Sequence, residues 1–109
     1  MRTNGYQRYK YSCDLYKFVI ETVGDTSTTN YYFVGNIAVN ASVDSSGRMT
    51  IKSEQPLAVG WVLTNVKDVN KEEILEGTRW QISSLEPVMS SFNNVETYRM
   101  KAVKFQGNI

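Results

Sequence analysis

The chain has 109 residues, and its 12 Lys and Arg against 11 Asp and Glu give a net charge of +1. This length suits one domain, and the near-neutral charge argues against a protein that coats nucleic acid through a basic surface. There is no histidine, and Cys13 is the single cysteine. The composition therefore lacks the commonest general base and metal ligand, and it excludes an internal disulfide and a CxxC site. We expect no enzymatic activity, no cofactor and no metal.

No stretch of the sequence has the character of a targeting or membrane segment. Residues 1–12 contain no apolar run, so no signal peptide is expected. The longest apolar stretches, such as Tyr31–Val34, fall far short of the ~20 residues that a membrane-spanning helix needs. We expect a protein of a reducing cytoplasm, or of a particle assembled there.

β-Branched and aromatic residues dominate the chain, and no long window keeps the helical period of ~3.6 residues. Alternation predicts a first strand over Leu15–Val23. The polar stretch Gly24–Asn30 is predicted as a loop. A long strand over Tyr31–Val43 follows, with apolar residues at its odd positions and a bulge or bend at Gly35.

Turn signals divide the rest of the chain. The sequence Asp44-Ser45-Ser46-Gly47 predicts a hairpin turn between two alternating segments. A later strand is expected to place Val59, Trp61, Leu63 and Asn65 on one face, and residues 89–94 are predicted as a loop. The strands predicted in this part are Arg48–Glu54, Leu57–Val66, Arg79–Leu85 and Val95–Phe105.

About six or seven strands with turn signals every ~8–12 residues predict an all-β fold. We expect a small antiparallel β-barrel, because closure protects the sheet edges of a chain that has no helix to cover them. Residues 1–12 are assigned to a flexible N-terminal arm and residues 13–109 to a single barrel domain. The expected core includes Trp61, Trp80, Ile82 and Tyr98.

The N-terminal arm interleaves cations with aromatic rings and has no acid before Asp14. Tyr and Arg are enriched in interface hot spots, so the arm suits contact with a neighbouring subunit. The same composition suits the phosphates and bases of a nucleic acid. It also suits a frayed tail whose tyrosines begin the first strand early. The residues concerned are Arg2, Tyr6, Arg8, Tyr9, Lys10 and Tyr11.

Other residues that could carry chemistry have simpler interpretations. We interpret Cys13 as a small strand residue, since no histidine is present to activate it as a nucleophile. The three glutamates within residues 72–76 are interpreted as part of a solvated connection, not as an acid–base pair held in a cleft. For Trp61 and Trp80, core packing is favoured over a role in stacking on a ligand.

The C-terminal half, over residues 57–69 and 76–105, has a recognisable order of features. A glycine turn and a Trp are followed by a strand that reaches a proline, a loop of the Phe-Gly-Asn-Val type, and a strand with Tyr-Arg and Ala. This order resembles the head-closure, or stopper, proteins of tailed bacteriophages. Thr78 departs from the pattern where an acid is common, and Asn93 where glycine is common. The matching residues are Gly77, Trp80, Pro87, Tyr98, Arg99 and Ala102.

The resemblance implies a β-barrel that forms a homo-oligomeric ring in the virion neck, between capsid and tail, after assembly in the host cytoplasm. Such a ring extends the channel of the portal and adaptor proteins, helps to retain packaged double-stranded DNA, and gives tail proteins a docking surface. It implies no catalytic residue and no membrane contact. A near-neutral charge fits a channel that DNA passes without sequence-specific binding. The loops expected to face the channel or a neighbour contain Asp25, Thr26, Asp44, Ser45, Ser46 and Gly47.

Two other functions stay open on the sequence. A tail-completion or tail-terminator subunit of the same particle would share the β plan and the absence of catalytic chemistry. A barrel of the OB type would instead bind single-stranded nucleic acid through aromatic side chains exposed on one sheet face. Its affinity would fall steeply as the salt concentration rises.

Overall fold

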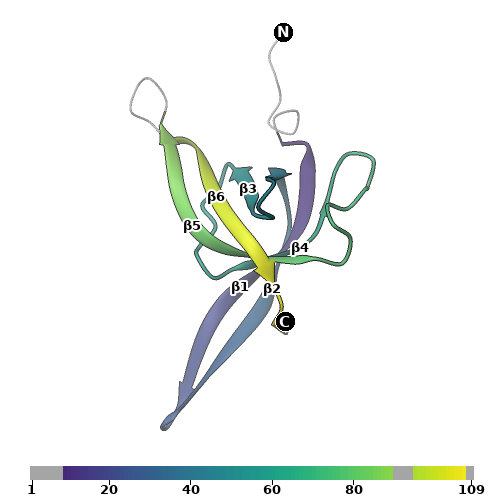
Figure 1. Ribbon diagram of the computed structural model, residues 1–109. Helices are drawn as coiled ribbons and strands as arrows, with labels where there is room; N and C mark the ends of the chain where they lie inside the picture. The colour runs from purple at the N-terminus through teal and green to yellow at the C-terminus, as the bar shows by residue number, and fades with distance from the viewer. Residues whose placement is uncertain (1–8, 90–94, 108–109) are drawn as a thin grey trace.

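A computed structural model describes residues 9–89 and 95–107. Within these ranges six antiparallel strands form one sheet, which closes on itself in the order β1-β2-β3-β6-β5-β4 (Figure 1). The predicted all-β barrel is confirmed, and the described residues form no helix. The strands are β1 (Tyr11–Val23), β2 (Thr26–Val43), β3 (Met49–Ser53), β4 (Val62–Lys67), β5 (Arg79–Met89) and β6 (Val95–Phe105).

Side chains from all six strands fill the inside of the barrel. In a strand, successive side chains point to opposite faces, so every second residue of each strand faces the interior. Trp80 and Ile82 of the expected core are buried there, whereas Trp61 and Tyr98 are partly buried and pack against the cluster. The buried cluster consists of Cys13, Leu15, Val39, Ala41, Met49, Ile51, Leu57, Leu63, Val66, Trp80, Ile82, Met100 and Ala102.

A bulge in β2 decides which of its residues reach the core. Leu15 pairs with Gly35 but Tyr16 pairs with Phe33, so Val34 is an extra residue on β2. The bulge predicted at Gly35 is confirmed. An extra residue exchanges the two faces of a strand, so the odd positions of β2 do not share one face as the alternation suggested. Ile37, Val39, Ala41 and Val43 lie on the core side, while Tyr31 and Phe33 lie outside.

The prediction of a loop over Gly24–Asn30 is wrong. Val23 pairs with Thr26, so only Gly24 and Asp25 form the turn, and β2 begins at Thr26. Gly24 has a φ of 62°, and glycine reaches such an angle at little cost at the first loop position of a two-residue hairpin. The threonines that made this stretch look like a loop are β-branched, which favours an extended backbone.

The strand predicted over Leu57–Val66 is also corrected, since β4 covers only Val62–Lys67. Val62 and Leu63 are adjacent and both buried, whereas Val59 is exposed. Alternation fails again between Leu63 and Val66, both buried, where the pairing with β1 changes register and Asn65 adopts a φ of 53°, which asparagine tolerates better than most residues. The amide nitrogen of Asn65 donates a hydrogen bond to Asp14 Oδ2 at 2.9 Å, which holds this irregular backbone against β1.

The remaining elements agree well with the predicted pattern. The hairpin at Asp44–Gly47 joins β2 to β3, and Val43 pairs with Met49 across it. β6 has the predicted bounds, and β5 continues past its predicted end and through Pro87 to Met89. The loop predicted over 89–94 lies outside the described residues from position 90 onward.

The core position of Trp80 makes it the most costly side chain to truncate. The residue is fully buried, and its indole nitrogen has no hydrogen-bond partner within the described part of the chain. We expect Trp80→Ala to lower the free energy of unfolding by about 3–5 kcal/mol. Trp61→Ala should cost less than half of that, because Trp61 only packs against the outside of the cluster. Urea denaturation followed by far-UV circular dichroism measures both, and equal losses at the two sites would contradict this assignment.

Candidate functional site: the β1–β2 ribbon

The β1–β2 hairpin extends beyond the barrel as a ribbon of two strands. β4 pairs with β1 only as far as Tyr16, and β3 pairs with β2 only from Asn40 onward. Among the described strands, residues 17–23 and 26–32 therefore pair only with each other. We call residues 17–32 the ribbon. It projects away from the barrel body (Figure 1) and lengthens the molecule to 57 Å along its longest axis.

Aromatic side chains fasten the base of the ribbon to the barrel. The ring centres of Phe18 and Tyr31 lie 5.6 Å apart, and those of Tyr31 and Phe105 lie 5.3 Å apart. Gln81 Nε2 also donates a hydrogen bond to the Tyr31 hydroxyl at 3.2 Å. A two-stranded hairpin is marginally stable by itself. These contacts with β5 and β6 therefore hold the ribbon and set the direction in which it leaves the barrel.

Beyond this anchor, the ribbon and the adjacent bulge expose large apolar side chains. Ile20 is 61% exposed and Phe33 is 60% exposed. Soluble monomers rarely leave extensive apolar surface uncovered, and such surface commonly marks an interaction site. The exposure follows from the fold, because within the described ranges no third strand pairs with this part of the hairpin. The apolar residues concerned are Ile20, Val23, Tyr32, Phe33 and Val34.

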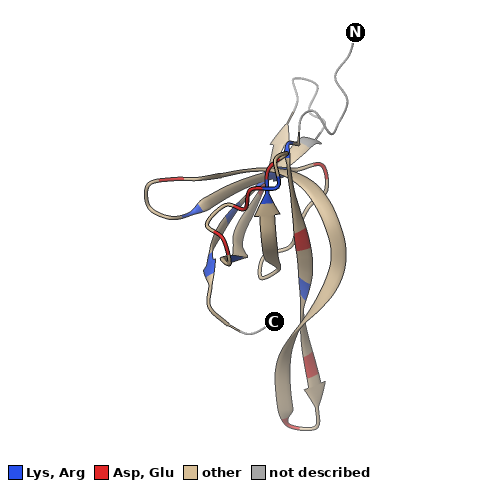
Figure 2. Cartoon of the chain, turned by 90° about the vertical axis from the view of Figure 1, so that its right-hand side faces the viewer, with Lys and Arg blue, Asp and Glu red and all other residues tan. Residues whose placement is uncertain are grey.

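Charge is distributed unevenly between the two strands of the ribbon. β1 carries Lys17 and Glu21 here, whereas β2 has no charged residue and no proline over its 18 residues. Figure 2 shows this contrast, with β2 in a single neutral colour along its length. Proteins commonly protect open sheet edges with lysine, proline or bulges, and on β2 only the bulge at Gly35 serves this purpose. The neutral edge of β2 is therefore suited to pairing with another strand.

A polar network crosses the face of the ribbon that also carries Val23 and Tyr32, opposite the face of Ile20 and Phe33. Glu21 Oε1 accepts hydrogen bonds from the amide of Asn30 at 2.7 Å and from the hydroxyl of Tyr32. The hydrogen bond to Glu21 is the main reason why the pKa of Tyr32 is raised, with smaller contributions from desolvation and from the charge of Glu21. Beside this network lies an open hollow of about 470 Å³, which is lined by Lys17, Val19, Glu21, Tyr32 and Phe33.

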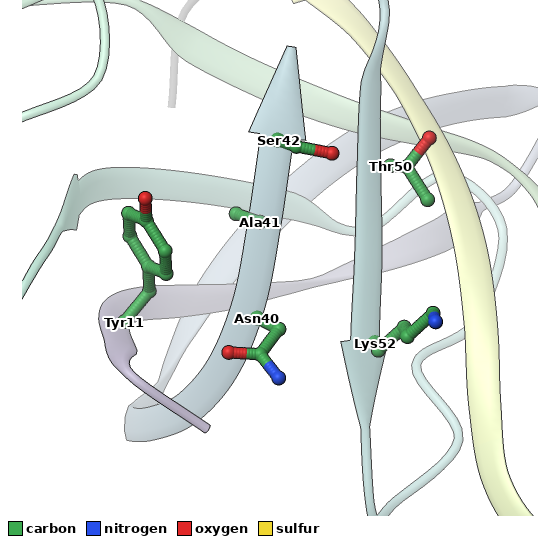
Figure 3. Close-up of a pocket in the computed structure, with 6 residues that line it drawn as sticks. All are labelled: Tyr11, Asn40, Ala41, Ser42, Thr50 and Lys52. Carbon is green, nitrogen blue, oxygen red and sulfur yellow. The ribbon is translucent and has the colours of Figure 1, made fainter. Parts of the chain in front are cut away.

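Two smaller hollows lie on the barrel wall. In Figure 3 the β2–β3 pair forms the floor of the first, about 260 Å³ in volume, with Tyr11 on one side and Thr50 and Lys52 on the other. The second, about 290 Å³, lies between β5 and β6, where Arg99 forms an ion pair with Glu86. Among residues 9–89 and 95–107, no three His, Cys, Asp or Glu side chains gather as metal ligands.

The N-terminal arm residues divide between described and undescribed parts of the chain. Arg2, Tyr6 and Arg8 lie outside the described residues. Tyr9 is buried, and its hydroxyl forms a hydrogen bond with Thr97 Oγ1 at 3.1 Å. The backbone nitrogen of Lys10 donates to Asn40 Oδ1 at 2.9 Å, and Tyr11 begins β1. The boundary expected between residues 12 and 13 therefore falls within the first strand.

The two loops expected to face a channel or a neighbour lie at opposite ends of β2. Asp25 and Thr26 are at the tip of the ribbon, and residues 44–47 form the β2–β3 turn. Asp44 Oδ1 accepts hydrogen bonds from the backbone and hydroxyl of Ser46 at 2.9 and 2.6 Å, and from the backbone of Arg48 at 3.1 Å. These bonds lower the pKa of Asp44, that from the Ser46 hydroxyl most of all. The fold does not bring the two loops together.

The other residues considered from the sequence have structural surroundings. Cys13 is buried, and burial, followed by the charge of Asp14, raises the pKa of its thiol to about 12. Glu73 Oε2 accepts a hydrogen bond from the backbone nitrogen of Gly77 at 3.0 Å, within the connection between β4 and β5. The backbone nitrogen of Glu72 donates to Asp68 Oδ1 at 3.0 Å, so this acidic stretch helps to shape its own turns.

The apolar surface of the ribbon is the feature that the sequence analysis missed. The absence of charge from Thr26 to Val43 was visible in the sequence, but it was obscured by the assignment of residues 24–30 to a loop. No protein-family model, no curated protein and no solved structure matches this chain. No helix among the described residues is long and apolar enough to span a membrane.

The anchoring of the ribbon can be tested by hydrogen exchange. Tyr31→Ala removes two ring contacts and the hydrogen bond from Gln81. Aromatic pairs contribute about 0.5–1.5 kcal/mol each, so we expect amide protection in residues 17–32 to fall by about tenfold or more. Protection of β3 and the β6 core should stay unchanged. Tyr32→Ala is the matched control, because its ring makes no contact with β6 among the ring pairs of the described chain, and it should cause a smaller fall.

The thiol of Cys13 is expected to be inert in the folded protein. With a pKa of about 12, its reaction with an aromatic disulfide reagent at pH 8 should be more than about a thousandfold slower than in urea. Because the folded pKa is raised, the stabilising effect of the neutral thiol is complete below about pH 8.5 and is lost as the pH rises towards 12.

The free energy of unfolding should therefore fall by about 1 kcal/mol between pH 8 and 9.5. Cys13→Ala should remove this pH dependence, because the variant has no thiol to titrate. Urea denaturation at the two pH values measures it. Rapid labelling of the folded protein would contradict the burial of this side chain.

Proposed function

We propose that the protein is a structural subunit of the neck of a tailed-bacteriophage particle, a head-closure or stopper protein that forms a ring between the portal–adaptor channel and the tail. The observation that carries this proposal is the ribbon. An apolar, edge-exposing extension on a closed barrel is what a subunit needs to reach its neighbours, and covering it requires an assembly. The role would be mechanical: to prolong the channel, to help retain the packaged DNA and to present a docking surface to the tail.

The arrangement of the C-terminal half supports the resemblance on which the proposal also rests. β5 and β6 are consecutive and antiparallel, with Pro87 paired with Tyr98. Trp80 follows the turn at Gly77, which has a φ of 79°, and points into the core. These positions agree with the two antiparallel strands that the order of motifs in this half implies.

The charge of the ribbon is compatible with a channel for DNA. It carries one cation, Lys17, and two acids, Glu21 and Asp25. Affinity for a nucleic acid backbone comes mainly from Lys and Arg that neutralise phosphates. A ribbon of this charge would let double-stranded DNA pass without holding it. Because the loops at Asp25 and at Asp44–Gly47 lie at opposite ends of β2, one can face the channel while the other meets an adjacent portal, adaptor or tail protein.

The proposal is tested by finding the chain in the particle. We expect mass spectrometry of purified phage to detect it, and an antibody label to appear in electron micrographs at the junction of capsid and tail. A label along the tail or at its far end would instead assign the chain to a tail component. Absence from purified particles, with known neck proteins detected in the same sample, would overturn the proposal of a virion protein.

A further inference from the structure

We propose that the ribbons of neighbouring copies pair edge to edge, the β2 edge of one copy with the β1 edge of the next, and close into a cylindrical antiparallel sheet. The partner at this surface is therefore a second copy of the same chain. This inference rests on the proposed function in one respect, namely that the copies are arranged in a ring. The pairing itself is argued from the edges, charges and exposed side chains of the ribbon.

The first argument is that both edges of the ribbon are open within the part of the chain that the structure describes. β1 has no β4 partner beyond Tyr16, and β2 has no β3 partner before Asn40. In an antiparallel strand, alternate residues direct their N–H and C=O groups away from the existing partner. Each copy thus offers two different unpaired edges, as a head-to-tail contact requires. Head-to-tail pairing repeats until the ring closes, and closure leaves no edge unpaired.

The second argument is the distribution of charge. On the ribbon, Lys17 and Glu21 belong to β1, while β2 is neutral throughout. When β2 of one copy lies against β1 of the next, each charge of β1 meets a neutral strand. No like charges are then placed opposite each other, an arrangement that would destabilise a sheet. Asp25 lies in the turn, outside the paired segment.

The third argument is the apolar surface beside these edges. Ile20 lies on β1, whereas Tyr32 and Phe33 lie on β2, and all three are exposed in the single copy. Edge-to-edge pairing places the β2 residues of one copy next to the β1 residues of another, which removes apolar area from water on both faces. On β2 the seam ends before Asn40, where β3 begins to pair with the same edge.

Cross-linking between two cysteine variants tests the pairing. Ile20→Cys is on β1 and Thr29→Cys is on β2, and these two residues share one face of the ribbon. The native Cys13 is buried and does not compete in the oxidation. Under mild oxidation, a mixture of the two variants should give disulfide-linked heterodimers, because a disulfide needs Cβ atoms about 3.5–4.5 Å apart. Each variant alone should give almost none, because like positions in neighbouring copies lie two strand spacings, about 9.6 Å, apart. Dimers formed by Thr29→Cys alone would show a two-fold β2–β2 contact and would overturn the proposal.

The oligomeric state provides a second measurement on the unmodified full chain. We expect sedimentation velocity at high protein concentration to show closed oligomers. Ile20→Lys should weaken their assembly at least tenfold, since a lysine at an open edge opposes strand pairing. Val69→Lys is the matched control, because Val69 is an exposed valine in the β4–β5 connection, away from the ribbon. Far-UV circular dichroism of both variants should match that of the unmodified chain, which checks that each keeps the fold.

The outcomes separate this inference from the proposed function. A chain that stays monomeric at every concentration, or oligomers that tolerate Ile20→Lys, would overturn the pairing even if the chain is found at the phage neck. Cross-linked rings formed by a chain that is absent from phage particles would support the pairing and overturn the neck assignment.

Discussion

The structure depends on one constraint: each strand has to find partners for the backbone groups on both of its edges. The described residues form no helix that could cover an open edge, so the sheet closes, and β1 pairs with β4 on one side and β2 on the other. Closure also creates the interior in which Trp80 and the other apolar side chains are buried. Within the described sheet the ribbon escapes this closure, as does the far half of β5, which pairs with β4 only at Trp80 and Gln81. The exposure of apolar side chains on the ribbon follows from its lack of a further strand partner.

The same constraint explains why the ribbon leaves the barrel where it does. The bulge at Gly35 exchanges the faces of β2, so that Tyr31 and Phe33 turn outward next to Phe18 and Tyr16. The outward rings meet Phe105 of β6 and fix the base of the ribbon. The bulge thus lies where the ribbon leaves the barrel wall. The aromatic contacts hold the base of the ribbon, so that its two edges keep a fixed direction relative to the barrel.

Much of the fold could be predicted from the pattern of side chains. The hairpin at Asp44–Gly47, the bounds of β6 and the bulge at Gly35 are all local features, because they depend on turn residues, alternation and the freedom of glycine. The errors occurred where local signals disagree with tertiary pairing. Thr26–Asn30 is polar enough to look like a loop, yet it is a strand because β1 lies beside it. Asn65 breaks an alternating pattern because its side chain bonds to Asp14.

The sequence by itself determined the class of the fold, the absence of histidine chemistry and the neutral character of β2, since these depend on composition and spacing alone. Only the tertiary structure decided that the barrel has six strands in this order, that Tyr9 belongs to it, and that the ribbon extends beyond β3 and β4. The physical reason is that an edge is open or paired according to which distant segment lies beside it. Local propensity cannot encode that neighbour, so an interaction surface made of unpaired edges becomes visible only when the chain is folded.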